Sequence, residues 1–151
     1  MPEHIVKPLV GIQIMNQPGA AIPAMATRGS SGYDLYACKH QTIAPGAYSM
    51  VPTGVRISMP QGLEAQIRPR SGLAAKYGVT VLNAPGTIDS DYRGEVCVLL
   101  INHGLADFTV EPGMRIAQMV FSRVTEVDFR LQDTLDTSHR GEGGFGSTGT
   151  R

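Results

Sequence analysis

The chain has 151 residues, of which 42% are hydrophobic and 17% charged, a composition typical of one globular domain rather than a disordered protein. Its 13 basic residues balance 13 acidic ones, which argues against binding to a nucleic-acid polymer. No apolar run approaches the ~20 residues of a membrane span, and the start of the sequence does not resemble a signal peptide. We therefore expect a cytoplasmic protein whose two cysteines, Cys38 and Cys97, are reduced.

Apolar and polar residues alternate with a period of two through much of the chain. The alternation covers residues 33–38, 55–59 and 63–68 and predicts strands with one buried face. The runs 95–102 and 116–121 are apolar at both phases, so we expect those strands to be covered on both faces, by a second sheet or by a neighbouring subunit. Turns containing Gly and Pro separate the segments. The pattern predicts an all-β sandwich, jelly roll or small barrel.

One segment, residues 71–78, predicts a short helix that Ser71 caps and Gly78 ends. Arg68 and Arg70 precede it. Backbone amides at a helix start attract anions, and guanidinium groups match phosphate oxygens. A solvated turn beside two strand arginines would have the same sequence, and spacing alone leaves both interpretations open.

Three further polar residues stand out beside or inside apolar segments. Asp89 and Asp91 flank a turn next to Tyr92; they are either turn formers or a general base beside a stacking surface. Gln118 interrupts an apolar run, and a buried amide must be hydrogen-bonded. It belongs either to a core network or to a ligand contact.

The strand pattern stops near residue 132, which divides the chain into a β-domain, 1–131, and a flexible glycine-rich arm, 132–151. Half of the stretch "RGEGGFGSTG" at 140–149 is glycine, the residue that loses most conformational freedom on ordering. Its Arg, Phe, Ser and Thr side chains suit the phosphates and the base of a nucleotide. The segment is either an ordinary frayed terminus or a segment ordered by its ligand.

Five stretches, taken in order, resemble the motifs of one enzyme family, the trimeric deoxyuridine triphosphatases (dUTPases). They are "SSGYDLYA" at 30–37, "RPRSGLAAKYGV" at 68–79, "NAPGTIDSDYRGEV" at 83–96, "RIAQMVF" at 115–121 and "RGEGGFGSTG" at 140–149. The resemblance implies a jelly-roll subunit that forms a homotrimer, with active sites shared between subunits and closed by the arm. It implies Mg²⁺-assisted hydrolysis of dUTP to dUMP and pyrophosphate, which limits uracil in DNA and supplies dUMP for dTMP synthesis.

The resemblance also assigns a role to individual residues. Two are expected to be catalytic: Asp89 orients and deprotonates the attacking water, and Arg140 contacts the phosphates. The expected substrate-binding residues are Arg70, Ser71, Gly72 and Gln118 for the phosphates, Asn83 and Thr87 near the uracil, Tyr92 against the deoxyribose, Phe145 stacked on the base, and Gly146, Ser147 and Thr148 at the γ-phosphate. Asp34 is expected to contact Mg²⁺ only through water, because the metal sits mainly on the substrate phosphates.

Two other functions share this fold pattern. A dCTP deaminase, alone or combined with triphosphatase activity, would release ammonia from dCTP. A non-catalytic jelly-roll module would be expected to lack at least one of the five motifs. The departures from the family pattern, Ser31 and Tyr33, do not touch the residues given a chemical role.

Overall fold

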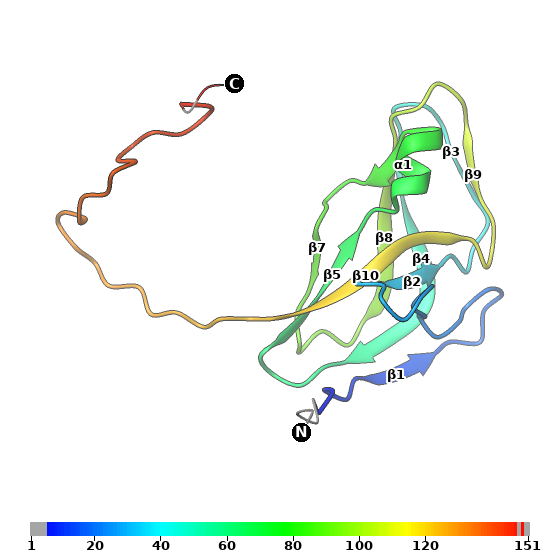
Figure 1. Ribbon diagram of the computed structural model, residues 1–151. Coiled ribbons are helices and arrows are strands. Elements are labelled where there is room, and N and C mark those ends of the chain that lie inside the picture. Colours follow the sequence, from blue (N-terminus) through cyan, green and yellow to red (C-terminus); the bar gives the residue numbers. More distant parts are fainter. Residues whose placement is uncertain (1–5, 148, 150–151) are drawn as a thin grey trace.

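The computed structural model of the protein describes residues 6–147 and 149. In this part of the chain, strands dominate and one short helix interrupts them (Figure 1). In chain order the elements are β1 (Gly11–Ile14), β2 (Tyr33–Tyr36), β3 (Gln41–Ile43), β4 (Tyr48–Ser58), β5 (Leu63–Arg68), α1 (Ser71–Tyr77), β6 (Val79–Val81), β7 (Gly86–Ile88), β8 (Glu95–Asn102), β9 (Phe108–Val110) and β10 (Arg115–Arg123). The all-β prediction with one short helix is confirmed.

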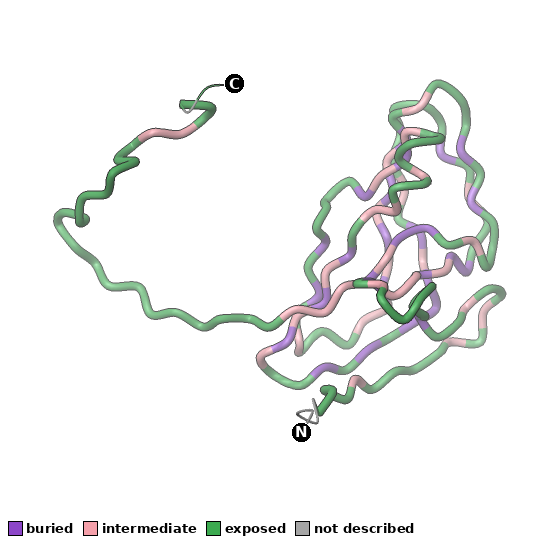
Figure 2. Tube along the Cα trace, viewed as in Figure 1, coloured by how far each residue is buried: buried purple, intermediate pink, exposed green. Residues whose placement is uncertain are grey.

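The strands form two antiparallel four-stranded sheets and a two-stranded ribbon. The sheet orders are β1-β4-β8-β6 and β2-β10-β5-β7, and β3 pairs with β9. Apolar residues from both large sheets meet in one core, which includes Leu35, Val98, Leu100 and Ile116 with exposures of 0 to 1%. Figure 2 shows this buried core inside the domain and the exposed segment that leaves it. Because the outward-facing side chains lie outside this core, one large sheet is free to carry the polar site residues on its outer face.

The structure corrects the sequence prediction of strand β4. The alternation predicted a strand from residue 55, whereas β4 begins at Tyr48 and continues through Pro52 and Gly54. A register shift against β8 between Pro52 and Arg56 accommodates these two residues. Gly54 adopts a φ of 69°, which a residue with a side chain rarely tolerates. Pro and Gly, which normally end strands, therefore mark a bulge inside the long strand β4.

The predicted helix is present, but its cap is not the residue that the sequence indicated. Arg70 occupies the N-cap position, with φ −93° and ψ 125°, and makes no side-chain capping hydrogen bond. Ser71 is the first helical residue, so the prediction of a Ser71 cap is wrong. Gly78 ends the helix in the left-handed conformation with φ 68°, as predicted.

The last strand ends at Arg123, and residues 124–147 continue away from the sandwich without further strands or helices (Figure 1). Their apolar side chains are exposed: Phe129 is 97% and Leu131 98% accessible.

Both cysteines, Cys38 and Cys97, are free. Desolvation by burial, with the Glu95 carboxylate as the next cause, raises the pKa of the Cys38 and Cys97 thiols.

Candidate functional site

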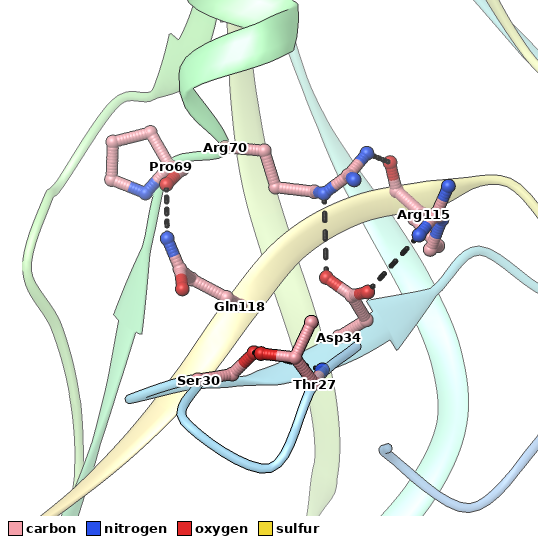
Figure 3. Close-up of polar contacts among 7 residues, drawn as sticks. All are labelled: Thr27, Ser30, Asp34, Pro69, Arg70, Arg115 and Gln118. Carbon is pink, nitrogen blue, oxygen red and sulfur yellow. Dashed lines mark hydrogen bonds and ion pairs between the residues drawn. The ribbon is translucent and has the colours of Figure 1, made fainter. Parts of the chain in front are cut away.

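A polar cluster lies on the outer face of the β2-β10-β5-β7 sheet, next to the start of α1 (Figure 3). Asp34 on β2 stands opposite Gln118 on β10, and Gln118 stands opposite Arg68 on β5. Directly opposed residues on neighbouring strands share one face of a sheet. Three residues that are far apart in the sequence therefore form one row across the sheet. Arg70 lies two positions after Arg68, the member of that row on β5.

Asp34 is the centre of the charged contacts in this cluster. Its Oδ1 lies 3.3 Å from Arg70 Nε, and its Oδ2 lies 3.4 Å from Arg115 Nη1. Arg70 also donates through Nη1 to the main-chain oxygen of Arg115 at 3.1 Å. The Asp34 side chain is only 13% exposed and that of Arg70 27%, so water screens the Asp34–Arg70 pair less than a surface pair. Two contacts thus fix the direction of the Arg70 guanidinium.

Arg115 was not among the residues that the sequence assigned to the site. A register shift between Arg115 and Ala117 interrupts the pairing of β10 with β2, and this irregularity coincides with the place where the Arg115 carbonyl accepts from Arg70. The stretch "RIAQMVF" contains Arg115, but nothing in its spacing indicates a partner 81 positions earlier in the chain.

Gln118 is half-buried, and its Nε2 donates to the main-chain oxygen of Pro69 at 3.0 Å. A Cβ on Gly32 would lie 2.5 Å from Gln118 Oε1, so the missing side chain of Gly32 provides the space for the amide. Of the two interpretations that the sequence left open, the structure therefore shows the internal network. The amide ties β10 to the residue before Arg70, and a ligand contact stays a prediction.

The second group of predicted residues lies on the segment 82–94, which joins the antiparallel pair β6 and β8, includes β7, and is called the hairpin. Asn83, Thr87, Asp89 and Tyr92 are all exposed. The turn at residues 89–92 is closed by a hydrogen bond from Tyr92 N to Asp89 O at 3.1 Å. Arg93 donates through Nη1 to the main-chain oxygens of Ser90, at 2.6 Å, and Tyr92, at 2.9 Å. This turn is therefore held by its own backbone and by the Arg93 side chain.

Asp89 lies at a different end of the sheet from Arg70. Ile88, the residue before Asp89, pairs with Ala65 near the start of β5, whereas Arg70 follows the end of β5. At about 3.3 Å per residue, the five positions from 65 to 70 correspond to roughly 17 Å. Asp89 instead lines a cleft of about 720 Å³ with Glu64, Arg93 and Glu126. One subunit does not bring the predicted base and the predicted phosphate-binding arginine together.

The third group lies on the arm, which makes local turns rather than contacts with the polar cluster. Hydrogen bonds join Gly141 N to Ser138 O, Gly143 N to Arg140 O, and Ser147 N to Gly144 O, all within 3.0–3.1 Å. Arg140 Nε donates to Gly143 O at 2.6 Å. Phe145 has a φ of 49° and is fully exposed. Gly146 and Ser147 follow it, and the predicted contact residue Thr148 lies outside the described residues.

The described residues do not form a protein cage for a divalent metal ion. No group of three or more His, Cys, Asp or Glu side chains is arranged to hold a metal among residues 6–147 and 149. At the polar cluster there is one carboxylate, Asp34, and both of its oxygens already face guanidinium groups. This arrangement fits a Mg²⁺ ion that arrives on the phosphates of a nucleotide and keeps its water, and does not fit a metal bound directly by several side chains.

The dUTPase family model matches residues 19–149. Curated relatives named deoxyuridine 5'-triphosphate nucleotidohydrolase include those of Maricaulis maris, 53% identical over 88% of this chain and 90% of the relative, and Sinorhizobium medicae, 54% identical over 91% and 89%. That of Rickettsia bellii is 55% identical over 85% and 87%.

Solved structures share the fold at lower identity. A variant of the Staphylococcus bacteriophage 80alpha dUTPase with dUpNHpp superposes with a TM-score of 0.87 at 22% identity, over 94% of this chain and 99% of that one. A phage phi11 dUTPase variant, in which a structural Mg(II) ion is coordinated, gives a TM-score of 0.78 at 17% identity, over 85% and 99%. The sequence match along most of its length and the shared fold establish that this chain belongs to the dUTPase family.

Proposed function

We propose that this protein hydrolyses dUTP to dUMP and pyrophosphate, and thereby limits uracil in DNA and supplies dUMP for dTMP synthesis. The observation that carries the proposal is family membership along residues 19–149, combined with a complete set of the side chains that the chemistry needs. We also propose that the enzyme works in the cytoplasm, where free thiols such as Cys38 and Cys97 are stable. No helix in the described residues is long and apolar enough to cross a bilayer.

In the proposed reaction, Asp89 accepts a proton from a water that attacks the α-phosphorus, and pyrophosphate leaves. The Asp89 carboxylate is exposed and lies on a turn that Arg93 holds, so it is available to hold such a water at hydrogen-bond distance. Mg²⁺ bound to the triphosphate would neutralise its charge and fix its conformation, with Asp34 touching the ion only through water. Positioning and electrostatics then supply most of the rate, as in other phosphoryl transfers.

The phosphates would bind at the start of α1. The first amides of a helix have no partner within it, so those of Ser71 and Gly72 can donate to an anion. The helix has seven residues, so its dipole is small, and the main attraction comes from these amides and from the oriented Arg70 guanidinium. Gln118 would add its amide from β10 once a phosphate competes for it.

The sugar and base would lie against the hairpin and under the arm. Asn83 and the hairpin backbone read the edge of uracil, Thr87 lies beside them, and Tyr92 packs against the deoxyribose. Arg140 reaches the phosphates, Phe145 stacks on the base, and Gly146 to Thr148 close over the γ-phosphate. Closure of such a segment excludes water and completes the charge-stabilising contacts.

We further propose that the enzyme is a homotrimer whose active sites are shared between subunits. The separation of roughly 17 Å along β5 supports sharing, because it places the predicted base and the predicted phosphate-binding arginine of one chain at opposite ends of that strand. Phe145 on the arm is fully exposed, so we propose that Phe145 and Arg140 contact a site on another subunit.

The outer face of the β4–β8 sheet is the surface that we assign to subunit contact. Met50 pairs with Leu99, and Tyr48 pairs with Ile101, all on the side away from the core. Met50 and Tyr48 are each 64% exposed and Leu82, on the same side, is 43% exposed. A contiguous apolar surface of this kind marks an interface. It also explains why the strand at 95–102 is apolar at both phases.

The activity test is to incubate the protein with Mg²⁺ and each deoxynucleoside triphosphate in turn and to measure pyrophosphate. We expect release from dUTP alone, with dUMP as the other product. Ammonia release from dCTP would instead assign the deaminase activity, and hydrolysis of none of these nucleotides would support a non-catalytic module. The Asp89→Asn variant is the control that excludes a contaminating hydrolase.

The shared site is tested by complementation. Trimers assembled from a mixture of Arg70→Ala and Asp89→Asn subunits should recover activity, because some sites then take both intact residues from different chains. Sites built from a single chain would all carry one defect, and the mixture would stay inactive. Sedimentation should show that Met50→Glu dissociates the trimer, whereas Leu105→Glu, at a turn residue that is fully exposed, should not.

A further inference from the structure

We propose that Gly94 is a positioning residue for sugar selection, because its missing side chain creates the space in which the Tyr92 ring lies. This inference rests on the proposed function, in which Tyr92 faces the deoxyribose of dUTP. It adds a residue that touches no substrate and acts through the ring of its neighbour.

The evidence is the close approach of the ring to the backbone at Gly94. A Cβ built on Gly94 would overlap the Tyr92 hydroxyl and would lie 2.5 Å from Cζ and 2.9 Å from Cε2. Real Cβ atoms do not approach other heavy atoms below 3.0 Å. Any side chain at position 94 would therefore displace the ring from this position or displace the chain beneath it.

The ring is held at its tip as well as at its base. The Tyr92 hydroxyl donates to the main-chain oxygen of Glu95 at 3.0 Å, so the ring reaches across Gly94 to the first residue of β8. At its base, the Tyr92 amide closes the turn with Asp89, and the Tyr92 carbonyl accepts from Arg93. These contacts select one ring orientation before any ligand binds, which is the preorganisation that binding specificity requires.

The fixed orientation decides what a bound sugar would meet. The position that a Cβ on Gly94 would take lies against one edge of the ring, at Cε2, Cζ and the hydroxyl, and the Tyr92 residue stays 45% exposed. The hydroxyl points to Glu95 and the sugar would meet the flat apolar face. Deoxyribose can contact such a face with its C2′ methylene. A ribose would have to bury its 2′-hydroxyl there without a hydrogen-bond partner, and an unpaired buried hydroxyl is costly.

Substitution at position 94 tests the ring contact and not the backbone. Gly94 is not among the glycines with positive φ, so alanine fits its backbone conformation. Gly29 is a matched control, because its φ is not positive and a Cβ there would meet nothing within 4 Å. The two Gly→Ala changes are chemically identical and differ only in what the new methyl group touches.

The experiment measures kcat/KM for dUTP and for UTP in the full-length protein, for Gly94→Ala, Tyr92→Ala, the double variant and Gly29→Ala. We expect Gly94→Ala to lower the dUTP-to-UTP ratio by at least about tenfold, since hydroxyl discrimination in such sites spans up to about a hundredfold. The double variant should match Tyr92→Ala, and Gly29→Ala should match the unchanged protein.

The other outcomes are equally decisive. An unchanged ratio in an active Gly94→Ala enzyme, or effects of the two single changes that multiply in the double variant, would overturn the inference. If Gly94→Ala does not fold, a double variant that folds and discriminates like Tyr92→Ala supports the ring contact, and a double variant that also fails to fold refutes it. A parent protein that does not hydrolyse dUTP would refute the proposed function instead.

Discussion

The polar cluster on the sandwich and the glycine-rich arm differ in how firmly their predicted site residues are held. Arg70, Asp34 and Gln118 each have hydrogen-bond or ionic partners from distant parts of the chain. Arg140 bonds only three residues away, and Phe145 is fully exposed. The first set is fixed when the protein folds, whereas in the proposed site a ligand would have to offset the ordering entropy of the second set.

Removal of the arm gives the largest effect that this comparison predicts. A chain that ends after Ser138 should keep its fold, because among the described residues the buried core ends at Met119 and the side chains packed against it end at Phe121, but it should lose Arg140 and Phe145. A phosphate-binding arginine of this kind is worth about 10³–10⁵ in kcat, so we expect a loss in that range with little change in the midpoint of thermal unfolding. Steady-state kinetics and circular dichroism measure both. Full activity of the shortened chain would show that the arm has no part in the site.

The next largest effect concerns Asp89, which lies on the sandwich rather than on the arm. Asp89→Asn keeps the size and shape of the side chain but replaces one carboxylate oxygen by an amide NH2 donor, which removes the negative charge and the proton acceptor. Loss of a general base costs about 10²–10⁴ in kcat, and we expect the affinity for a non-hydrolysable dUTP analogue to stay within about threefold, since the change leaves the neutral contacts in place. Calorimetric titration and single-turnover kinetics separate the two. A variant with unchanged kcat would remove Asp89 from its role.

Stability should depend on the sandwich alone, and Asn102 tests this. Its side chain is fully buried, donates to Ile43 O at 2.9 Å and Ala106 O at 2.8 Å, and accepts from Gly104 N at 2.8 Å. Asn102→Ala leaves these main-chain groups unpaired, so we expect a loss of about 2–3 kcal/mol in the free energy of unfolding. Urea denaturation at fixed protein concentration measures it.

The matched change in the arm is Gly144→Ala. A Cβ there would meet nothing within 4 Å, and Gly144 is not among the glycines with positive φ. We expect the unfolding free energy to stay within about 0.5 kcal/mol of the parent value. Equal losses from Asn102→Ala and Gly144→Ala would mean that the arm contributes to the folded core, and the comparison would then fail.

The sequence predicted those parts of the fold that depend on local pattern. Strand β8 occupies the predicted residues 95–102, because the continuous apolar run between Gly94 and His103 defines both of its ends. The helix was predicted from its boundary residues, Ser71 and Gly78, although its N-cap is Arg70, one residue earlier. Strand β4 was shortened, since Pro52 and Gly54 usually end strands and only the pairing with β8 shows that here they form a bulge.

The sequence indicated three members of the polar cluster but not the contacts between them. The motifs indicate Asp34, Arg70 and Gln118, whereas their proximity depends on the order β2-β10-β5, which no local pattern contains. Arg115 was missed because its role arises from an ion pair and a carbonyl at a strand irregularity. The distance between Asp89 and Arg70 could not be foreseen either, since it follows from the register of β5 with β7.

The smallest effect on catalysis that we predict concerns the charge that holds Arg70. Asp34→Asn preserves the shape of the side chain but removes the negative charge between Arg70 and Arg115. A hydrogen bond to a charged group contributes about 1.5–3 kcal/mol, part of which is retained by the amide oxygen, so we expect kcat/KM for dUTP to fall about tenfold. The opposite result is informative: tighter nucleotide binding would mean that Asp34 restrains the attraction of two arginines for phosphate. The variants Arg70→Lys and Asp34→Asn should lower kcat/KM by similar factors. If the double variant is no worse than either single variant, the two residues act as one unit. That unit, already formed in the isolated subunit, is what the arm would close upon.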